Sequence, residues 1–197
     1  MKKNVFVALV VAGAMSFAGC NKKVDEKTMA DMNQFTTDWS AMGQKASDWS
    51  KQLMETSQHA KEFAAKQTEM MNSMMNSKDE AMKTKMHEMS ETANQNAANF
   101  DAMMNDWNTF KASWDDNTKA YTDWSAKVAK GEVTPEDAVK GMADWKTKMA
   151  DAQQKMTNWT TAFNAAKEST DKNMAAADEM TKSMPAATTA PAGKMKK

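Results

Sequence analysis

Methionines are the side chains of this 197-residue chain that could carry chemistry of their own. Two short stretches, "MMNSMM" and "MKTKMHEM", bring together Met70, Met71, Met74, Met75, Met82, Met86 and Met89, with His87 among them. Thioether sulfur is a soft ligand suited to Cu(I) or Ag(I), and it is also oxidised reversibly to the sulfoxide. The chain nevertheless has 22 methionines along its whole length, and methionine is an adaptable core filler. Core packing therefore explains most of them, and metal binding or oxidant scavenging stands as an alternative.

The other reactive residue types do not form a catalytic pattern. His59 and His87 are expected on different helices, and neither has a nucleophile or a second ligand at a suitable spacing. The chain has no Gly-rich phosphate loop and no Cys/His set with metal-ligand spacing. We therefore predict no catalytic, cofactor-binding or metal-binding residues, and no enzyme activity.

The first twenty residues, "MKKNVFVALVVAGAMSFAGC", have the features of an export signal. Two lysines precede a short apolar run, and small residues lead to Cys20, which is the only cysteine. The end of this segment, Phe17-Ala18-Gly19-Cys20, resembles the lipobox of bacterial lipoproteins. That resemblance implies cleavage after residue 19, a diacylglycerol and palmitate on Cys20, and a short linker over 20–28.

The lipobox resemblance also implies a location and partners. Acyl chains on Cys20 would hold the protein to membrane lipid, because each buried methylene contributes about 0.8 kcal/mol. Asn21 after the cysteine favours the outer membrane of the cell envelope, by analogy with Gram-negative sorting. Lysine and acidic residues number 26 each and arginine is absent, so no nucleic-acid partner is expected. An envelope protein or the cell wall is the expected partner.

A heptad pattern predicts the fold. Apolar residues recur at alternating three- and four-residue steps, as in Met32, Phe35, Trp39, Met42 and Ala46, which is typical of coiled coils. The pattern occurs three times and predicts helices over about 29–76, 78–130 and 135–184. Nearly equal lengths and short connections predict an all-α, antiparallel up-down-up three-helix coiled-coil bundle over 29–184. The same apolar heptad positions could instead pack between copies of the chain, so a homo-oligomer is an alternative.

Local signals mark the helix ends. Gly131 suits a left-handed helix stop, Thr134 a cap and Pro135 a first helical position. Ser77 and Glu80 fit a capping box, which predicts a hairpin near 76–79. A continuous helix with a phase slip is the alternative there. The proline-containing residues 185–197 have no apolar periodicity, and we expect a disordered tail.

The antiparallel topology predicts which side chains meet. It brings Trp39 near Trp114, and Trp107 near both Trp49 and Trp159, so one half of the bundle should be aromatic and the other rich in methionine. The tryptophans are expected in the core, with a ligand groove between helices as the alternative. Polar residues at core positions are expected to set the register of the helices: Asn96, Asn117 and Asn173.

One further resemblance concerns the plan of the whole chain. A lipobox cysteine, a helical heptad body and a C-terminal lysine, Lys197, are similar to the murein lipoprotein family of Gram-negative outer membranes. In that family the terminal lysine is joined to peptidoglycan, which implies a cell-wall tether through the tail. Here the body is three helices rather than one short helix, so the similarity is one of plan, and a loosely basic tail is the alternative.

Overall fold

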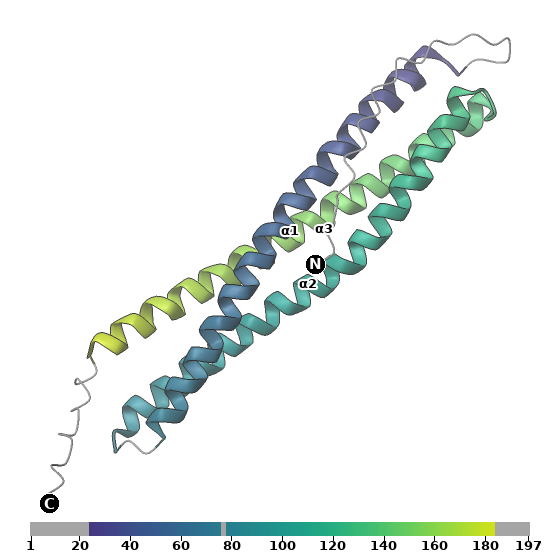
Figure 1. The fold of residues 1–197 in the computed structure, drawn as a ribbon. Helices are drawn as coiled ribbons and strands as arrows, with labels where there is room; N and C mark the ends of the chain where they lie inside the picture. Colours follow the sequence, from purple (N-terminus) through teal and green to yellow (C-terminus); the bar gives the residue numbers. More distant parts are fainter. Residues whose placement is uncertain (1–23, 76–77, 184–197) are drawn as a thin grey trace, which may run out of the picture. The chain divides into compact units, whose positions relative to one another are not determined.

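Three long helices contain nearly all of the described residues. The computed structural model describes residues 24–75 and 78–183. Helix α1 spans Glu26–Met74, α2 spans Glu80–Ala129 and α3 spans Pro135–Ser183 (Figure 1). No strand occurs in these two ranges, and the helices pack against one another, which confirms the all-α three-helix bundle. The signal segment, Cys20, Ser77 and the tail lie outside the described residues.

The helix ends follow from local capping. Asp25 precedes α1, and its carboxylate accepts hydrogen bonds from the Thr28 amide (2.9 Å) and hydroxyl (2.8 Å). These bonds satisfy one of the amide groups that a helix N-terminus leaves without a partner. As a result, α1 begins at residue 26, three residues before the expected start at 29.

The two connections differ in how well they were predicted. Gly131 has φ +72°, and Thr134 Oγ1 accepts from the Asp137 amide at 3.2 Å, so the predicted stop and cap are confirmed. The first connection separates α1 from α2, which excludes the continuous helix. Its cap is Asp79, whose Oδ1 accepts from the Met82 amide at 3.0 Å. Asp79 is a cap that the sequence did not predict, and Ser77, where the capping box was predicted, lies outside the described residues, so that prediction stays untested.

The chain divides into two compact units, each containing a part of every helix. Unit 1 contains the described residues up to Ser57 together with Phe100–Asn164. Unit 2 contains the described residues of Gln58–Asn99 and those from Ala165 onward. The heptad pattern continues through these boundaries, so the sequence indicates one bundle over 29–184 and no division.

Burial follows the heptad in both units. Every described heptad position that the sequence predicts as core is buried or half-buried. Small residues directly after a core position are also buried: Ser47, Ser57, Ala64, Ser90 and Ala97. Each helix of a three-helix bundle faces two neighbours, and its buried stripe is therefore wider than the single row of a two-stranded coiled coil.

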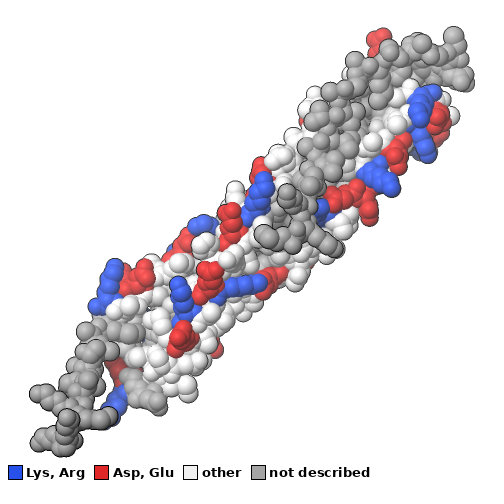
Figure 2. All heavy atoms as spheres, viewed as in Figure 1, with Lys and Arg blue, Asp and Glu red and all other residues white. Residues whose placement is uncertain are grey.

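The surface carries interspersed charges of both signs, as Figure 2 shows for one face. Several pairs lie within one helix, such as Glu168 and Lys172, with 2.6 Å between Oε1 and Nζ. Lys146 on α3 and Asp31 on α1 join two helices of unit 1, with 2.8 Å between Nζ and Oδ2. Among the described helices, none is apolar enough over a sufficient length to cross a membrane.

Candidate functional site

The core of unit 1 is a continuous set of aromatic rings that includes all seven tryptophans. Trp39 stacks on Trp114 with ring centroids 4.1 Å apart and 10° between the planes. The edge of Trp145 meets Trp39 at 6.0 Å, and Trp39 Nε1 donates to Thr118 Oγ1 at 2.9 Å. These three tryptophans come from the three helices, so the aromatic rings connect the whole cross-section of unit 1.

A second group of rings lies further along the same unit. Trp49 stacks on Trp159 at 5.5 Å and meets Trp107 edge-on at 5.8 Å. Trp107 also lies 6.2 Å from Trp159. All three predicted tryptophan contacts, including the one between Trp39 and Trp114, are therefore confirmed, as is the concentration of aromatic residues in one part of the bundle.

Trp49 differs from Trp39 in its polar atom. The Nε1 atom of Trp49 is buried and has no hydrogen-bond partner. Water cannot replace the missing partner easily, because the residue is only 7% exposed. A buried donor without a partner costs about 1–3 kcal/mol. The favourable contacts of the ring with Trp159 and Trp107 offset this cost.

Two shallow hollows lie between α1 and α3 of unit 1. The first, the Asp48 hollow, measures about 570 Å³ and is lined by Gln44, Asp48 and Trp49 on α1 and by Met156 and Thr160 on α3. The second, the Asp38 hollow, measures about 280 Å³. It has Gln34, Phe35 and Asp38 on α1, and Met149 and Gln153 on α3. Both are open depressions bordered by amides and carboxylates.

A ten-residue repeat in α1 supplies the α1 side of these two hollows. The segments "QFTTDWS" (34–40) and "QKASDWS" (44–50) share the order Gln, Asp, Trp, Ser at equal spacing. In each copy the Gln amide donates to the carboxylate four residues later, at 2.9 Å for Gln34 to Asp38 and 3.0 Å for Gln44 to Asp48. The repeated Gln-to-Asp bond shows that the polar side of each core tryptophan is organised in the same way in both copies.

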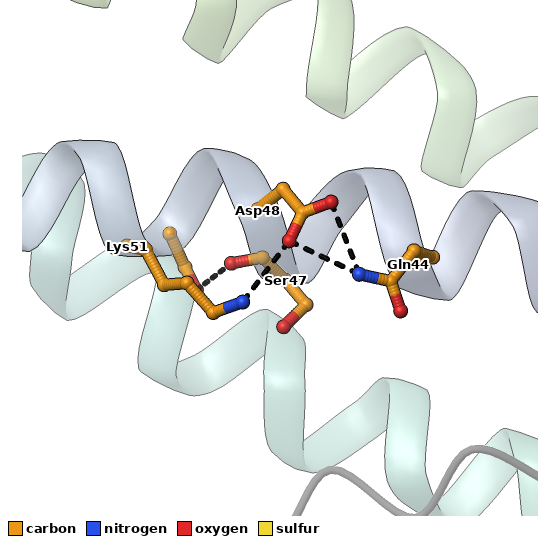
Figure 3. Close-up of polar contacts among 5 residues, drawn as sticks. Gln44, Ser47, Asp48 and Lys51 are labelled. Carbon is orange, nitrogen blue, oxygen red and sulfur yellow. Dashed lines mark hydrogen bonds and ion pairs between the residues drawn. The ribbon is translucent and has the colours of Figure 1, made fainter.

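Asp48 is the most connected carboxylate of this surface (Figure 3). It accepts from the Gln44 amide and, at 3.1 Å, from the Lys51 ammonium group. The hydrogen bond from Gln44, followed by that from Lys51, lowers the pKa of Asp48 below its usual value. Asp48 is therefore ionised at neutral pH and already satisfied by its own helix, which does not suit a general acid or base.

Two glycines in unit 1 adapt the helices to large rings. A Cβ atom at Gly43 would lie 3.4 Å from Nε1 of Trp114, an ordinary contact. A Cβ at Gly141 would lie 2.7 Å from Cζ2 of Trp124, closer than real atoms approach. Gly141 on α3 therefore lets the half-buried Trp124 of α2 lie directly against the helix backbone.

The core of unit 2 is built from thioethers and alanines. Met86, which is fully buried, packs with Met89, Ala177 and Met180. Further residues pack on this cluster and are only partly buried: Phe63, Met70, Met74, Met82 and Ala176. We call the nine residues together the methionine cluster. Six of the methionines that the sequence predicts to gather therefore pack together in unit 2.

Buried amides cross between helices in unit 2. Asn173 Nδ2 donates to the Met89 carbonyl at 2.9 Å, and Asn96 Nδ2 donates to Ser169 Oγ at 3.0 Å. These contacts agree with the predicted register-setting role of Asn96 and Asn173. Asn117 in unit 1 is half-buried, and its Oδ1 accepts from Lys148 Nζ at 3.3 Å.

The remaining candidate residues do not form a site. His59 and His87 are exposed, and the contact of His87 is with Glu91 at 3.3 Å on its own helix. Across residues 24–75 and 78–183, no group of three or more His, Cys, Asp or Glu could hold a metal ion. Cys20 and Lys197 lie outside the described residues, so lipid attachment and tethering stay predictions.

Comparison of this chain with protein-family models, with curated proteins and with solved structures found no match.

Proposed function

We propose that this protein is a lipoprotein of the bacterial cell envelope, anchored through Cys20, whose helical body has a structural or protein-interaction role. The observation that carries the proposal is the segment Phe17-Ala18-Gly19-Cys20 after a basic and apolar leader. This cysteine is the only one in the chain and stands where a lipobox requires it. An outer-membrane location follows by analogy from Asn21.

The body supports an interaction role over catalysis. Its cores are filled by side chains, and charges of both signs are interspersed on the face that Figure 2 shows. The Asp38 and Asp48 hollows are open and shallow, and the carboxylates of Asp38 and Asp48 are hydrogen-bonded within α1. Such a surface fits contact with another envelope macromolecule better than the enclosed site that small-molecule chemistry needs.

Metabolic labelling with palmitate tests the anchor. Wild-type protein is expected to incorporate label and to fractionate with membranes, whereas Cys20→Ala should lose both properties. Phe17→Leu, which introduces the more common lipobox residue, is the matched control and should keep them. Membrane association of an unlabelled Cys20→Ala protein would contradict the proposal.

Site-directed cross-linking in cells tests the interaction role. A photo-reactive amino acid at residue 44 or 48, in the larger hollow, is expected to give a discrete adduct with an envelope component. The same amino acid at residue 98, which is exposed on α2 in unit 2, is the control. Equal, diffuse labelling at all positions would argue for a spacer without a specific partner.

A second candidate function rests on the methionine cluster. Its six thioethers come from all three helices and pack in one place, and thioethers bind Cu(I) and Ag(I). Competition of the full-length chain with a chelator for Cu(I) tests this role. Binding no tighter than micromolar, or binding unchanged by Met70→Leu, Met74→Leu and Met82→Leu together, would exclude it.

A further inference from the structure

The two units expose their methionines very differently. In unit 1 most methionine side chains are buried, including Met32 and Met142 at 4% and Met156 at 3%. In unit 2 the sulfurs lie at graded depths. Met75 is 66% exposed and Met174 40% exposed, Met70, Met74 and Met82 are half-buried, and Met86 is fully buried. An oxidant dissolved in water therefore meets thioethers of unit 2 at several depths, from fully exposed to half-buried.

The half-buried members of that series support the core itself. Met70 and Met74 at the end of α1 and Met82 at the start of α2 pack on the buried part of the methionine cluster. The rest of the cluster is Ala176, Ala177 and one ring, Phe63. A second hydrophobic cluster in unit 2 consists of Ala64, Ala93 and Ala97, again with Phe63. Unit 2 thus depends on thioethers for the large apolar surfaces that tryptophan supplies in unit 1.

We propose that the methionine cluster is a modification site for two-electron oxidants of the peroxide class, and that its oxidation loosens unit 2 selectively. In the reaction a thioether sulfur of Met70, Met74 or Met82 attacks one peroxide oxygen. An S–O bond forms, the O–O bond breaks, and the second oxygen leaves as water after proton transfer. Sulfur loses two electrons to give the sulfoxide, and the peroxide is reduced by two electrons.

The structural consequence follows from the polarity of the product. A sulfoxide is a strong hydrogen-bond acceptor, and burying it against Met86, Met89 and Met180 without a donor is unfavourable. The modified side chain must turn towards water, and the methionine cluster then loses the apolar contacts that this side chain made. Oxidation of Met75 or Met174 has no such effect, because these side chains are already exposed. Reversal requires a methionine sulfoxide reductase and a thiol reductant.

Peroxide titration of the full-length, detergent-purified chain tests the proposal. Peptide mass spectrometry is expected to find sulfoxide first at the exposed methionines of both units, which are Met54, Met75 and Met174. Met70, Met74 and Met82 should follow, while the buried Met32, Met142 and Met156 stay reduced. When the second group reacts, amide hydrogen exchange in unit 2 should accelerate by at least about tenfold, with little change in unit 1. Treatment with the two reductases should restore the original exchange rates.

Two matched variants assign the effect to its sulfurs. Leucine conserves volume and resists oxidation, so Met70→Leu, Met74→Leu and Met82→Leu together should abolish the peroxide-induced acceleration. Met54→Leu, Met75→Leu and Met174→Leu together remove only exposed thioethers and should leave it intact. Equal oxidation of both units, or sulfoxide at residues 70, 74 and 82 without faster exchange in unit 2, would overturn the proposal. The wild-type measurement decides this point even if a variant folds poorly.

Discussion

The indole ring of Trp124 on α2 lies against the backbone of Gly141 on α3, so closely that a Cβ at residue 141 would stand 2.7 Å from Cζ2 of the ring. No comparable crowding exists at Gly43, where the nearest atom, Nε1 of Trp114, would be 3.4 Å away. Both glycines lie inside helices of unit 1. Substituting each of them by alanine therefore distinguishes the effect of helix propensity on stability from the effect of side-chain packing.

Alanine should have opposite effects at these two glycines. Within a helix Gly→Ala gains about 0.5–1 kcal/mol, so Gly43→Ala is expected to raise the free energy of unfolding. Gly141→Ala has the same favourable effect on helix propensity, but it also forces Trp124 to move. Overpacking of this kind lowers the free energy of unfolding by about 1–3 kcal/mol. Chemical denaturation followed by circular dichroism measures both variants. Stabilisation by Gly141→Ala would mean that Trp124 moves away freely.

Trp39 and its neighbour Asp38 should differ greatly in their effect on stability. Trp39→Ala removes a stacked ring, an edge contact and a hydrogen bond to Thr118, and it should cost about 3–5 kcal/mol. Asp38→Ala removes an exposed carboxylate bonded to Gln34, and the expected change is close to zero. Thermal unfolding of the two variants provides the comparison. Similar losses would assign the Asp-Trp element a structural role beyond its ring.

Tyr121 predicts a specific alkaline dependence of stability. Burial raises the pKa of its phenol, and the hydrogen bond with Thr36 opposes this only in part. The pKa of the phenol in the folded protein lies above the unfolded value of about 10. The contribution of Tyr121 to the free energy of unfolding is therefore fully present below pH 10 and is lost as pH rises through the raised pKa. Tyr121→Phe should lower stability at neutral pH by about 1 kcal/mol, since the bond to the Met32 carbonyl is lost. The difference between the two proteins should shrink as pH increases above 10.

Asp31 predicts an acid dependence of the opposite sign. The hydrogen bond from Lys146, with its positive charge, lowers the pKa of Asp31. The stabilising contribution is thus present above the unfolded pKa of about 3.9 and is lost as pH falls through the lowered folded pKa. Asp31→Asn should flatten the acid limb of the stability curve slightly. Since both groups are partly exposed, high salt should erase the difference between the two proteins.

Asn173 should contribute more to stability than an exposed asparagine of the same unit. Asn173→Ala removes a buried bond to the Met89 carbonyl and the packing of the amide, and a loss of about 1–2 kcal/mol is expected. Asn72→Ala on α1, where the side chain is exposed, is the control and should be nearly neutral. Denaturant midpoints of the two variants test the difference. An unchanged midpoint for Asn173→Ala would remove its predicted register role.

The sequence predicts the repetitive part of this fold because repetition is a local property. Heptad spacing identifies the buried tryptophans, and antiparallel folding about Glu132 places Trp107 beside Trp159. Thr134 and Pro135 form the predicted helix start because capping involves only neighbouring residues. These features require no knowledge of the partner helix beyond its direction.

Features that depend on the shape of a neighbouring helix were not predicted. Gly141 breaks no heptad, and only the position of Trp124 shows why a side chain is excluded there. Buried serines such as Ser47 reflect the two-sided contact of each helix rather than periodicity. At the start of α2 the Asp79 carboxylate accepts from the Met82 amide, and the sequence, in which Ser77 also suits a cap, does not show by itself that Asp79 takes part.

The placement of every tryptophan in unit 1 has an optical consequence. Intrinsic fluorescence excited at the indole band reports on that unit alone, whereas far-ultraviolet ellipticity sums over the helices of both units. If unit 2 melts first, ellipticity will fall while the emission maximum stays constant. The protein therefore contains its own spectroscopic label for deciding whether the two units unfold as one cooperative system or in sequence.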